Sequence, residues 1–222
     1  MRKLTMGRRM VALTSALGFA LALVVTGASG ATAGAATLAP AVAAPEMGIR
    51  FFPDGDAGQC SGPQQQFVAP PSFTTPIRFD TDSRPGGCQF AFGIYDPNNA
   101  LAGLSASYGW TPSPGGDASQ CGPHQGTFTM PISAFQTFGT QLRDDTDNRA
   151  GWCNLTFTLS GRTDIALLVQ FWADGDPNQC HGALPRNDAY TVTAGAPLTL
   201  GLDTDNRVGG CWLALSIQHS GF

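Results

Sequence analysis

Three stretches of the chain alternate apolar and polar residues with a period of two, which predicts strands with one buried face. Each stretch follows a cysteine. Their apolar positions are Phe90, Phe92 and Ile94; Leu155, Phe157 and Leu159; and Leu213, Leu215 and Ile217. A second set of strands is predicted around Ile77 and Phe79, around Leu142, and around Leu198, Leu200 and Leu202. Beyond the first 45 residues no stretch has helical periodicity, so the pattern predicts an all-β fold.

Two further strands are expected in each part of the chain. Residues 49–52 align with 169–172, but the middle copy holds Trp110 followed by Pro112 and Pro114. Because proline donates no ladder hydrogen bond, we expect an edge strand or a loop there. Short strands are also predicted at 67–68, 128–130 and 190–192.

Two motifs recur three times along the chain. The first reads DGDAGQC at 54–60, GGDASQC at 115–121 and DGDPNQC at 174–180, so that Gly115 takes the place of the first Asp in the middle copy. The second reads DTDSR at 80–84 and DTDNR at 145–149 and 203–207, and a Cys follows eight residues after its first Asp. A fixed repeat of this kind decides the architecture.

The repeats divide the chain at 44–104, 105–163 and 164–222, with four strands expected in each. Two arrangements are open. The repeats either close into one β domain with pseudo-threefold symmetry, like a β-trefoil or a β-prism, or follow one another as three disulfide-stapled modules. The lack of Ser/Gly-rich linkers favours one closed domain, because a unit of this size is marginally stable alone.

Residues 1–43 have the features of a secretory signal peptide: a basic start, an apolar run at 11–25 and small-residue cleavage sites ending at Ala33 or Ala43. The alternative is an uncleaved anchor. Without this segment the chain keeps all 16 acids but only 8 Arg and no Lys, a net charge of about −8. This charge argues against binding of nucleic acid, which needs clustered positive charge.

Six cysteines in an exported chain predict three disulfides. Since each repeat holds two, the expected pairs are Cys60–Cys88, Cys121–Cys153 and Cys180–Cys211. A cysteine-based metal cluster is disfavoured because the chain has no CxxC motif and little His.

The repeated acidic motifs have two competing interpretations. If the disulfides form, the acids of each repeat are drawn together and need positive charge among them. Calcium is one candidate cofactor, with ligands from Asp54, Asp56, Asp80, Asp82, Asp117, Asp145, Asp147, Asp174, Asp176, Asp203 and Asp205. In the other interpretation, Arg84, Arg149 and Arg207 pair with these acids and fasten structural turns.

Candidate ligand contacts are polar and aromatic. Gln59, Gln120 and Gln179 precede the first Cys of each repeat, and either bond the loop backbone or contact sugar hydroxyls. Trp110, Trp152, Trp172 and Trp212 are either core residues or stacking platforms for a saccharide. No catalytic residues are assigned, because no catalytic motif or triad is recognisable.

The sequence therefore predicts a secreted, non-enzymatic, disulfide-stabilised β-repeat protein that binds carbohydrate or a cell surface. Rival hypotheses are a protein-directed factor, such as a protease inhibitor or a toxin, and a purely structural extracellular protein. The identity of the ligand and the oligomeric state do not follow from the sequence.

Overall fold

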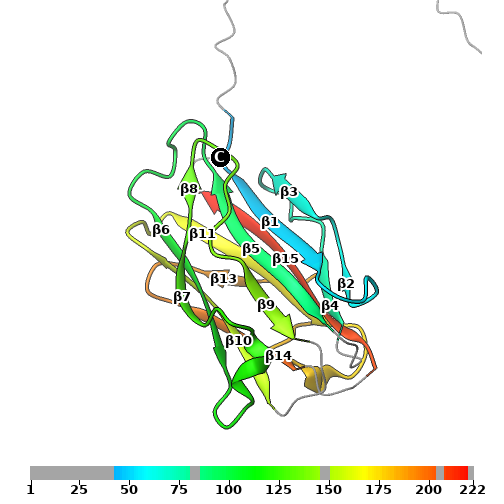
Figure 1. Cartoon of the computed structure of the whole chain (residues 1–222). Helices are drawn as coiled ribbons and strands as arrows, with labels where there is room; N and C mark the ends of the chain where they lie inside the picture. The colour runs from blue at the N-terminus through cyan, green and yellow to red at the C-terminus, as the bar shows by residue number, and fades with distance from the viewer. Residues whose placement is uncertain (1–42, 81–85, 146–150, 204–207, 220–222) are drawn as a thin grey trace, which may run out of the picture. The chain divides into compact units, whose positions relative to one another are not determined.

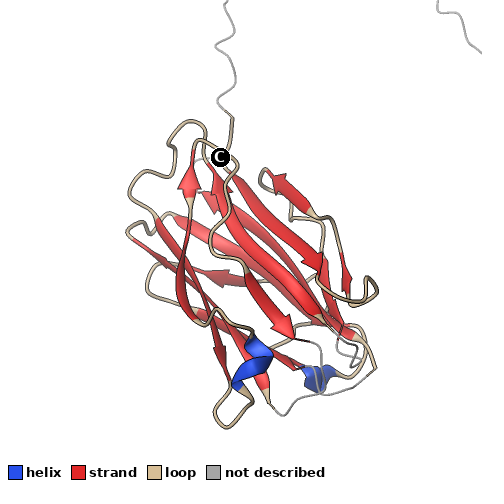
Figure 2. Ribbon diagram, viewed as in Figure 1, coloured by secondary structure: helices blue, strands red, loops and turns tan. Residues whose placement is uncertain are grey.

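The computed structural model describes residues 43–80, 86–145, 151–203 and 208–219, and residues from Ala41 onward form one compact unit. In these ranges the chain is all-β, and its only helices are two single-turn 3-10 helices (Figure 2). None of the helices among the described residues is long and apolar enough to cross a membrane. The candidate signal peptide, apart from Ala43, lies outside the described residues.

The strands form three sheets, which we number by the repeat that supplies the two long central strands (Figure 1). Sheet 1 contains β3 (Gln65–Val68), β1 (Glu46–Pro53), β5 (Gly87–Tyr95), β8 (Ile132–Ser133) and β9 (Leu142–Asp145). Sheet 2 contains β12 (Cys180–His181), β14 (Leu198–Asp203), β10 (Trp152–Ser160), β6 (Ser105–Pro112) and β7 (Gly126–Met130). Sheet 3 contains β13 (Tyr190–Val192), β11 (Ile165–Ala173), β15 (Gly210–His219), β4 (Ile77–Asp80) and β2 (Cys60–Ser61).

The centre of each sheet is an antiparallel pair from a single repeat. The pairs are β1 with β5, β6 with β10, and β11 with β15. The alternating stretches after the second cysteines are β5, β10 and β15, so the pattern of apolar residues correctly predicted these strands. In β10 the burial alternates residue by residue, as a strand with one face in the core requires.

The strand before each second acidic motif leaves its own repeat. Strand β4 of repeat 1 pairs with β15 in sheet 3, β9 of repeat 2 pairs with β5 in sheet 1, and β14 of repeat 3 pairs with β10 in sheet 2. Every sheet therefore contains strands from two repeats, which is incompatible with three separate modules in a row. The described strands form three sheets and no closed barrel.

The first strand of repeat 2 is a central strand, so the expectation of an edge strand or a loop was wrong. Strand β6 lies between β10 and β7, and Tyr108 and Trp110 are fully buried. Proline is tolerated because Pro112 is the last residue of the strand.

The three predicted disulfides are present: Cys60–Cys88, Cys121–Cys153 and Cys180–Cys211. Two of them join different sheets, because Cys60 lies in β2 of sheet 3 and Cys88 in β5 of sheet 1, while Cys180 lies in sheet 2 and Cys211 in sheet 3. Together the disulfides indicate an oxidising, extracellular-type compartment.

One hydrophobic core is shared by all three sheets. Phe79 of β4 packs edge-on against Phe51 and Phe90 of sheet 1, with ring centroids 5.0 and 5.3 Å apart. Phe90 in turn meets Trp110 of sheet 2 at 5.1 Å. Since these aromatic contacts cross from sheet to sheet, the sheets stabilise one another.

The acidic loops gather where the strands of different repeats meet. Figure 2 shows the 3-10 helices η1 (Ala118–Cys121) and η2 (Pro177–Gln179) at the same end of the sheets. Each helix lies inside a first acidic motif, immediately before or at its cysteine. This end of the fold carries most of the candidate residues.

Candidate functional site

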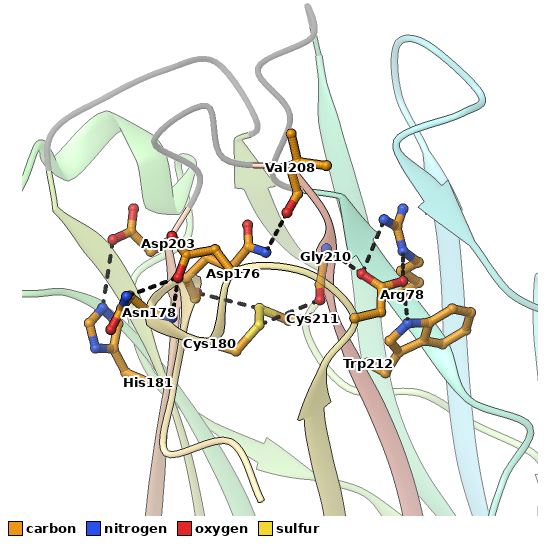
Figure 3. The surroundings of a disulfide bond; sticks show 12 residues. Arg78, Asp176, Asn178, Cys180, His181, Asp203, Val208, Gly210, Cys211 and Trp212 are labelled. Carbon is orange, nitrogen blue, oxygen red and sulfur yellow. Dashed lines mark hydrogen bonds and ion pairs between the residues drawn. A yellow bond between two sulfur atoms is a disulfide. The ribbon is translucent and has the colours of Figure 1, made fainter. Parts of the chain in front are cut away.

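An arginine of repeat 1 binds acids of two repeats. Arg78 Nε lies 2.7 Å from Asp174 Oδ2, and Nη1 lies 2.7 Å from Asp80 Oδ2. Asp174 belongs to the first acidic motif of repeat 3, whereas Asp80 opens the second motif of repeat 1. The guanidinium therefore holds two carboxylates together across the boundary between β4 and β15, next to the Cys180–Cys211 disulfide (Figure 3).

The same arrangement joins repeats 2 and 1. Arg143 Nε lies 2.5 Å from Asp54 Oδ2, and its Nη1 lies 3.0 Å from Asp145 Oδ2. Gln89 also donates to Asp54, at 3.0 Å. The sequence motifs did not identify Arg78 and Arg143 as partners of the acids.

The third boundary, where β14 of repeat 3 pairs with β10 of repeat 2, has different side chains. Gly201 of β14 takes the place of the arginine, and Trp152 and His181 pack against each other beside it, with ring centroids 4.2 Å apart and ring planes tilted by 33°. His181 Nε2 lies 3.6 Å from Asp203 Oδ2 (Figure 3). An aromatic pair thus occupies the space that an Arg–Asp pair fills at the other two boundaries.

The residue that replaces the first Asp in repeat 2 is Ser113, not Gly115 as the motif alignment predicted. The Ser113 amide donates to Trp152 O at 2.7 Å, as the Asp54 and Asp174 amides donate to Gly87 O and Gly210 O. The Ser113 hydroxyl also accepts from the Trp152 amide. The loop of repeat 2 is two residues longer, which displaced the alignment.

The electrostatics of the acids follow from these contacts. Partial burial alone would raise the pKa of Asp174, but hydrogen bonds from Arg78 and Trp212 outweigh it and lower that pKa. The pKa of Asp54 is lowered in the same way, with Arg143 and Gln89 as donors outweighing burial. Both carboxylates are therefore ionised at neutral pH and act as acceptors.

The second acid of each first motif stabilises the local backbone. Asp117 and Asp176 are the N-cap residues of η1 and η2, and accept hydrogen bonds from the amides of Ser119 and Asn178. Asp56 accepts from the Gly58 amide at 2.7 Å. These acids fix turns, as the structural interpretation of the motifs requires.

Several residues of the calcium and Arg-turn hypotheses lie outside the described residues: Asp82, Asp147, Asp205, Arg84, Arg149 and Arg207. Within the described ranges, no three acidic, His or Cys side chains are grouped so that they could hold a metal ion. The described acids contact arginines, His181 and backbone amides instead. The described acids thus hold turns and strand boundaries, and the calcium and Arg-turn hypotheses stay predictions.

The three repeated glutamines are core residues. Gln59, Gln120 and Gln179 are each 0% exposed. Gln179 Nε2 donates to Val208 O at 3.1 Å, which ties the first acidic motif to the segment before the second cysteine. Their placement matches hydrogen bonding to the loop backbone, and a saccharide in solvent does not reach them in this structure.

Two of the tryptophans also serve the fold. Trp110 is fully buried, and its Nε1 donates to Cys121 O and Arg143 O at 2.8 and 3.1 Å. Trp152 packs on His181 and donates to Asn154 Oδ1. Trp110 therefore forms no part of a ligand surface, and Trp152 fills the third boundary.

The other two tryptophans form an aromatic ladder on sheet 3. Trp172 and Trp212 face each other across β11 and β15, with parallel rings whose centroids are 5.9 Å apart. Arg78 lies over Trp212 and Arg186 over Trp172, 6.0 and 5.9 Å from the ring centroids. Asp174 Oδ2 accepts from Trp212 Nε1 at 2.8 Å and so fixes the orientation of that indole.

A pocket of about 350 Å³ opens beside this ladder. Its lining consists of Thr75, Pro76, Trp172, Asp174, Arg186 and Trp212. Trp172 is only 7% exposed, whereas Trp212 is half-buried, so Trp212 offers more of its ring to a ligand. Apolar rings beside a few fixed polar groups are typical of a small-molecule or saccharide site.

The tryptophan pair beside the pocket is not repeated in the other two sheets. Where sheet 3 has Trp172 and Trp212, sheet 1 has Phe52 and Gln89, by the register of β1 with β5. At the matching register of β6 and β10, sheet 2 has Thr111 and Asn154. The backbone framework is thus present three times, while the paired tryptophans occur once.

A buried acid lies in the core near the same end of the sheets. Asp144 is 0% exposed and neither of its carboxyl oxygens has a hydrogen-bond partner among the described residues. In the strand register Asp144 lies opposite Cys88, just as Phe79 lies opposite Cys211 and Leu202 opposite Cys153. Burial, reinforced by the charge of Asp145, raises the pKa of Asp144 well above its usual value.

Comparison with known proteins adds no relative. No protein-family model matches the chain, and neither a curated protein nor a solved structure matches it.

Proposed function

We propose that this is a secreted carbohydrate-binding protein whose ligand site is the pocket beside Trp172 and Trp212. The observation that carries the proposal is the half-buried Trp212 ring, held in place by Asp174 and lining a pocket with Trp172. An aromatic face stacks on the apolar face of a sugar ring, while nearby polar groups bond its hydroxyls.

The rigidity of the site supports this proposal. Asp174 accepts from Trp212 Nε1, from Arg78 and from the Gly210 amide. Because the indole is already ordered, a ligand loses little affinity to the ordering of the protein. The disulfide Cys180–Cys211 lies beside this network (Figure 3).

The site occupies one of the three sheets, although the strand framework is repeated three times. Since the paired tryptophans occur in sheet 3 alone, we expect one aromatic site per chain rather than three. Binding should therefore follow a single-site isotherm with a stoichiometry of one, and avidity would need either an oligomer or a multivalent surface.

We also propose that the repeats are related by a prism-like, pseudo-threefold arrangement. The cyclic transfer of β4, β9 and β14 to sheets 3, 1 and 2 supports it. Secretion through the N-terminal segment is part of the same proposal, and the three disulfides support an oxidising destination.

The test is a glycan array followed by a tryptophan fluorescence titration. We expect specific binding by the oxidised protein, a change in indole emission on titration, and a loss of affinity of about tenfold or more in Trp212→Ala. Trp152→Ala is the matched control, because it removes a part-exposed tryptophan outside the pocket and should leave affinity unchanged. Silence across a broad array, or equal losses in both variants, would contradict the proposal.

A further inference from the structure

Arg186 is presented to the pocket by a tight turn. The Asp188 amide donates to Pro185 O, and Asn187 has a φ of 82°, as the third residue of a type II turn requires. The turn is tied to β11, because Leu184 N donates to Phe171 O. The backbone that carries Arg186 is therefore held over Trp172.

The guanidinium of Arg186 is available for a ligand. Across the described part of the chain, it forms neither a hydrogen bond nor an ion pair, and its contact is with the Trp172 ring. Arg78 and Arg143, by contrast, are each bound to two carboxylates. Arg186 is therefore the cation in the pocket lining, and its N–H donors have no other partner among the described residues.

The carboxylate that lines the pocket is already occupied. Asp174 is the pocket's other charged group, but Oδ1 already accepts from the Gly210 amide and from Arg78, and Oδ2 accepts from Arg78 and Trp212. The polar side chains left for a ligand are Arg186, which only donates, and Thr75, whose hydroxyl can donate or accept. The complementary ligand group accepts hydrogen bonds and carries negative charge.

We infer that the ligand is an acidic saccharide, with a ring on Trp212 and a carboxylate on Arg186. This inference rests on the proposed function. A carboxylate takes two parallel hydrogen bonds from a guanidinium, which gives both affinity and orientation. With a net charge of about −8 beyond the N-terminal segment, the protein does not retain polyanions non-specifically, so binding of an acidic sugar reports a local contact.

The experiment compares matched acidic and neutral ligands. Oligosaccharides of glucuronate, galacturonate, mannuronate or guluronate are titrated beside their carboxyl-reduced counterparts, which keep the rings and linkages but lose the charge. We expect at least one acidic member to bind roughly tenfold or more tightly than its neutral partner. Arg186→Gln should remove most of that difference, because it should cost the acidic member far more affinity than its neutral partner.

Arg50→Gln is the matched control, because Arg50 also lies over an aromatic ring, Phe52 in sheet 1, at 5.6 Å. It should keep the full acidic preference. Equal binding of acidic and neutral partners overturns the acidic-ligand inference and leaves the saccharide proposal standing. Equal losses for both partners in Arg186→Gln also overturn it. Absence of binding by every member and by a neutral glycan array overturns both.

Discussion

Arg78 and Asp174 are 96 residues apart in the chain, yet the Nε of one lies 2.7 Å from the Oδ2 of the other. The pair joins repeat 1 to repeat 3 at the point where β4 enters sheet 3. Asp174 uses the same carboxylate to hold Trp212. One ion pair therefore serves both the assembly of the repeats and the shape of the candidate site.

Arg78→Gln should destabilise the whole fold. The side chains of Arg78 and Asp174 are 18% and 32% exposed, so the pair is partly screened, and we expect a loss of about 1–3 kcal/mol in the free energy of unfolding. The measurement is chemical denaturation. Arg50→Gln is the control, because Arg50 is exposed and lies over the Phe52 ring of its own repeat, an exposed contact that contributes less than about 1 kcal/mol. Equal losses in the two variants would show that the inter-repeat pair has no special role.

Asp144→Leu should stabilise the protein at neutral pH. Because burial raises the pKa of Asp144 in the folded state, the native protein binds the proton more strongly than the unfolded chain. The contribution of Asp144 to the free energy of unfolding is therefore fully present below its unfolded pKa and is lost as pH rises through its folded pKa. Leucine removes this loss and matches Leu202 at the same register, with a gain of about 1–3 kcal/mol at pH 7 to 8.

The check on Asp144 is the free energy of unfolding of both proteins across pH 4 to 8. The gap between wild type and Asp144→Leu should widen with pH. Asp164→Asn is the control, because Arg162 lowers the pKa of Asp164 to about 2, so that its contribution is lost only as pH falls toward that value and its gap should stay nearly constant above pH 4. A constant gap across pH would mean that Asp144 does not titrate in the core.

Loss of one inter-sheet disulfide should weaken all three repeats together. Cys180 and Cys211 join sheets 2 and 3 across 31 residues, for which the chain-entropy model gives about 3–4 kcal/mol. We expect the Cys180→Ser/Cys211→Ser variant to unfold in a single calorimetric transition at lower temperature. Two separate transitions, one of them unchanged from wild type, would contradict the exchange of strands between repeats.

Gly201→Ala should destabilise the third boundary through a steric clash. A Cβ at Gly201 would lie 2.7 Å from Trp152 Cδ1 and 2.8 Å from His181 Cβ. Overpacking of this kind costs roughly 1–3 kcal/mol. Adding Trp152→Gly, which restores the glycine found at 87 and 210 in the same register, should recover part of the loss. Additive effects in thermal denaturation would mean that the two residues do not compete for space.

The repeats in the sequence also indicate side-chain roles. Aligned on the second acidic motif, Asp144 falls opposite Phe79 and Leu202, which marks it as a polar residue at a core position. The arginines follow the same logic. Arg78 and Arg143 occur where the neighbouring repeat supplies Asp174 or Asp54, whereas Gly201 occurs where the neighbouring repeat supplies Ser113. Arg186 lies outside the motifs, so no repeated signal marked it.

What the sequence determined by itself was local. Alternation with a period of two depends on neighbouring residues, and it predicted β5, β10 and β15 together with the strands that lead into the second acidic motifs. Two cysteines per repeat were enough to select the disulfide pairs. Only the tertiary structure decided which strands pair, because contacts between residues far apart are set by packing in a common core, not by local period. That exchange of strands pairs Arg78 with Asp174 and forms the pocket beside Trp172 and Trp212.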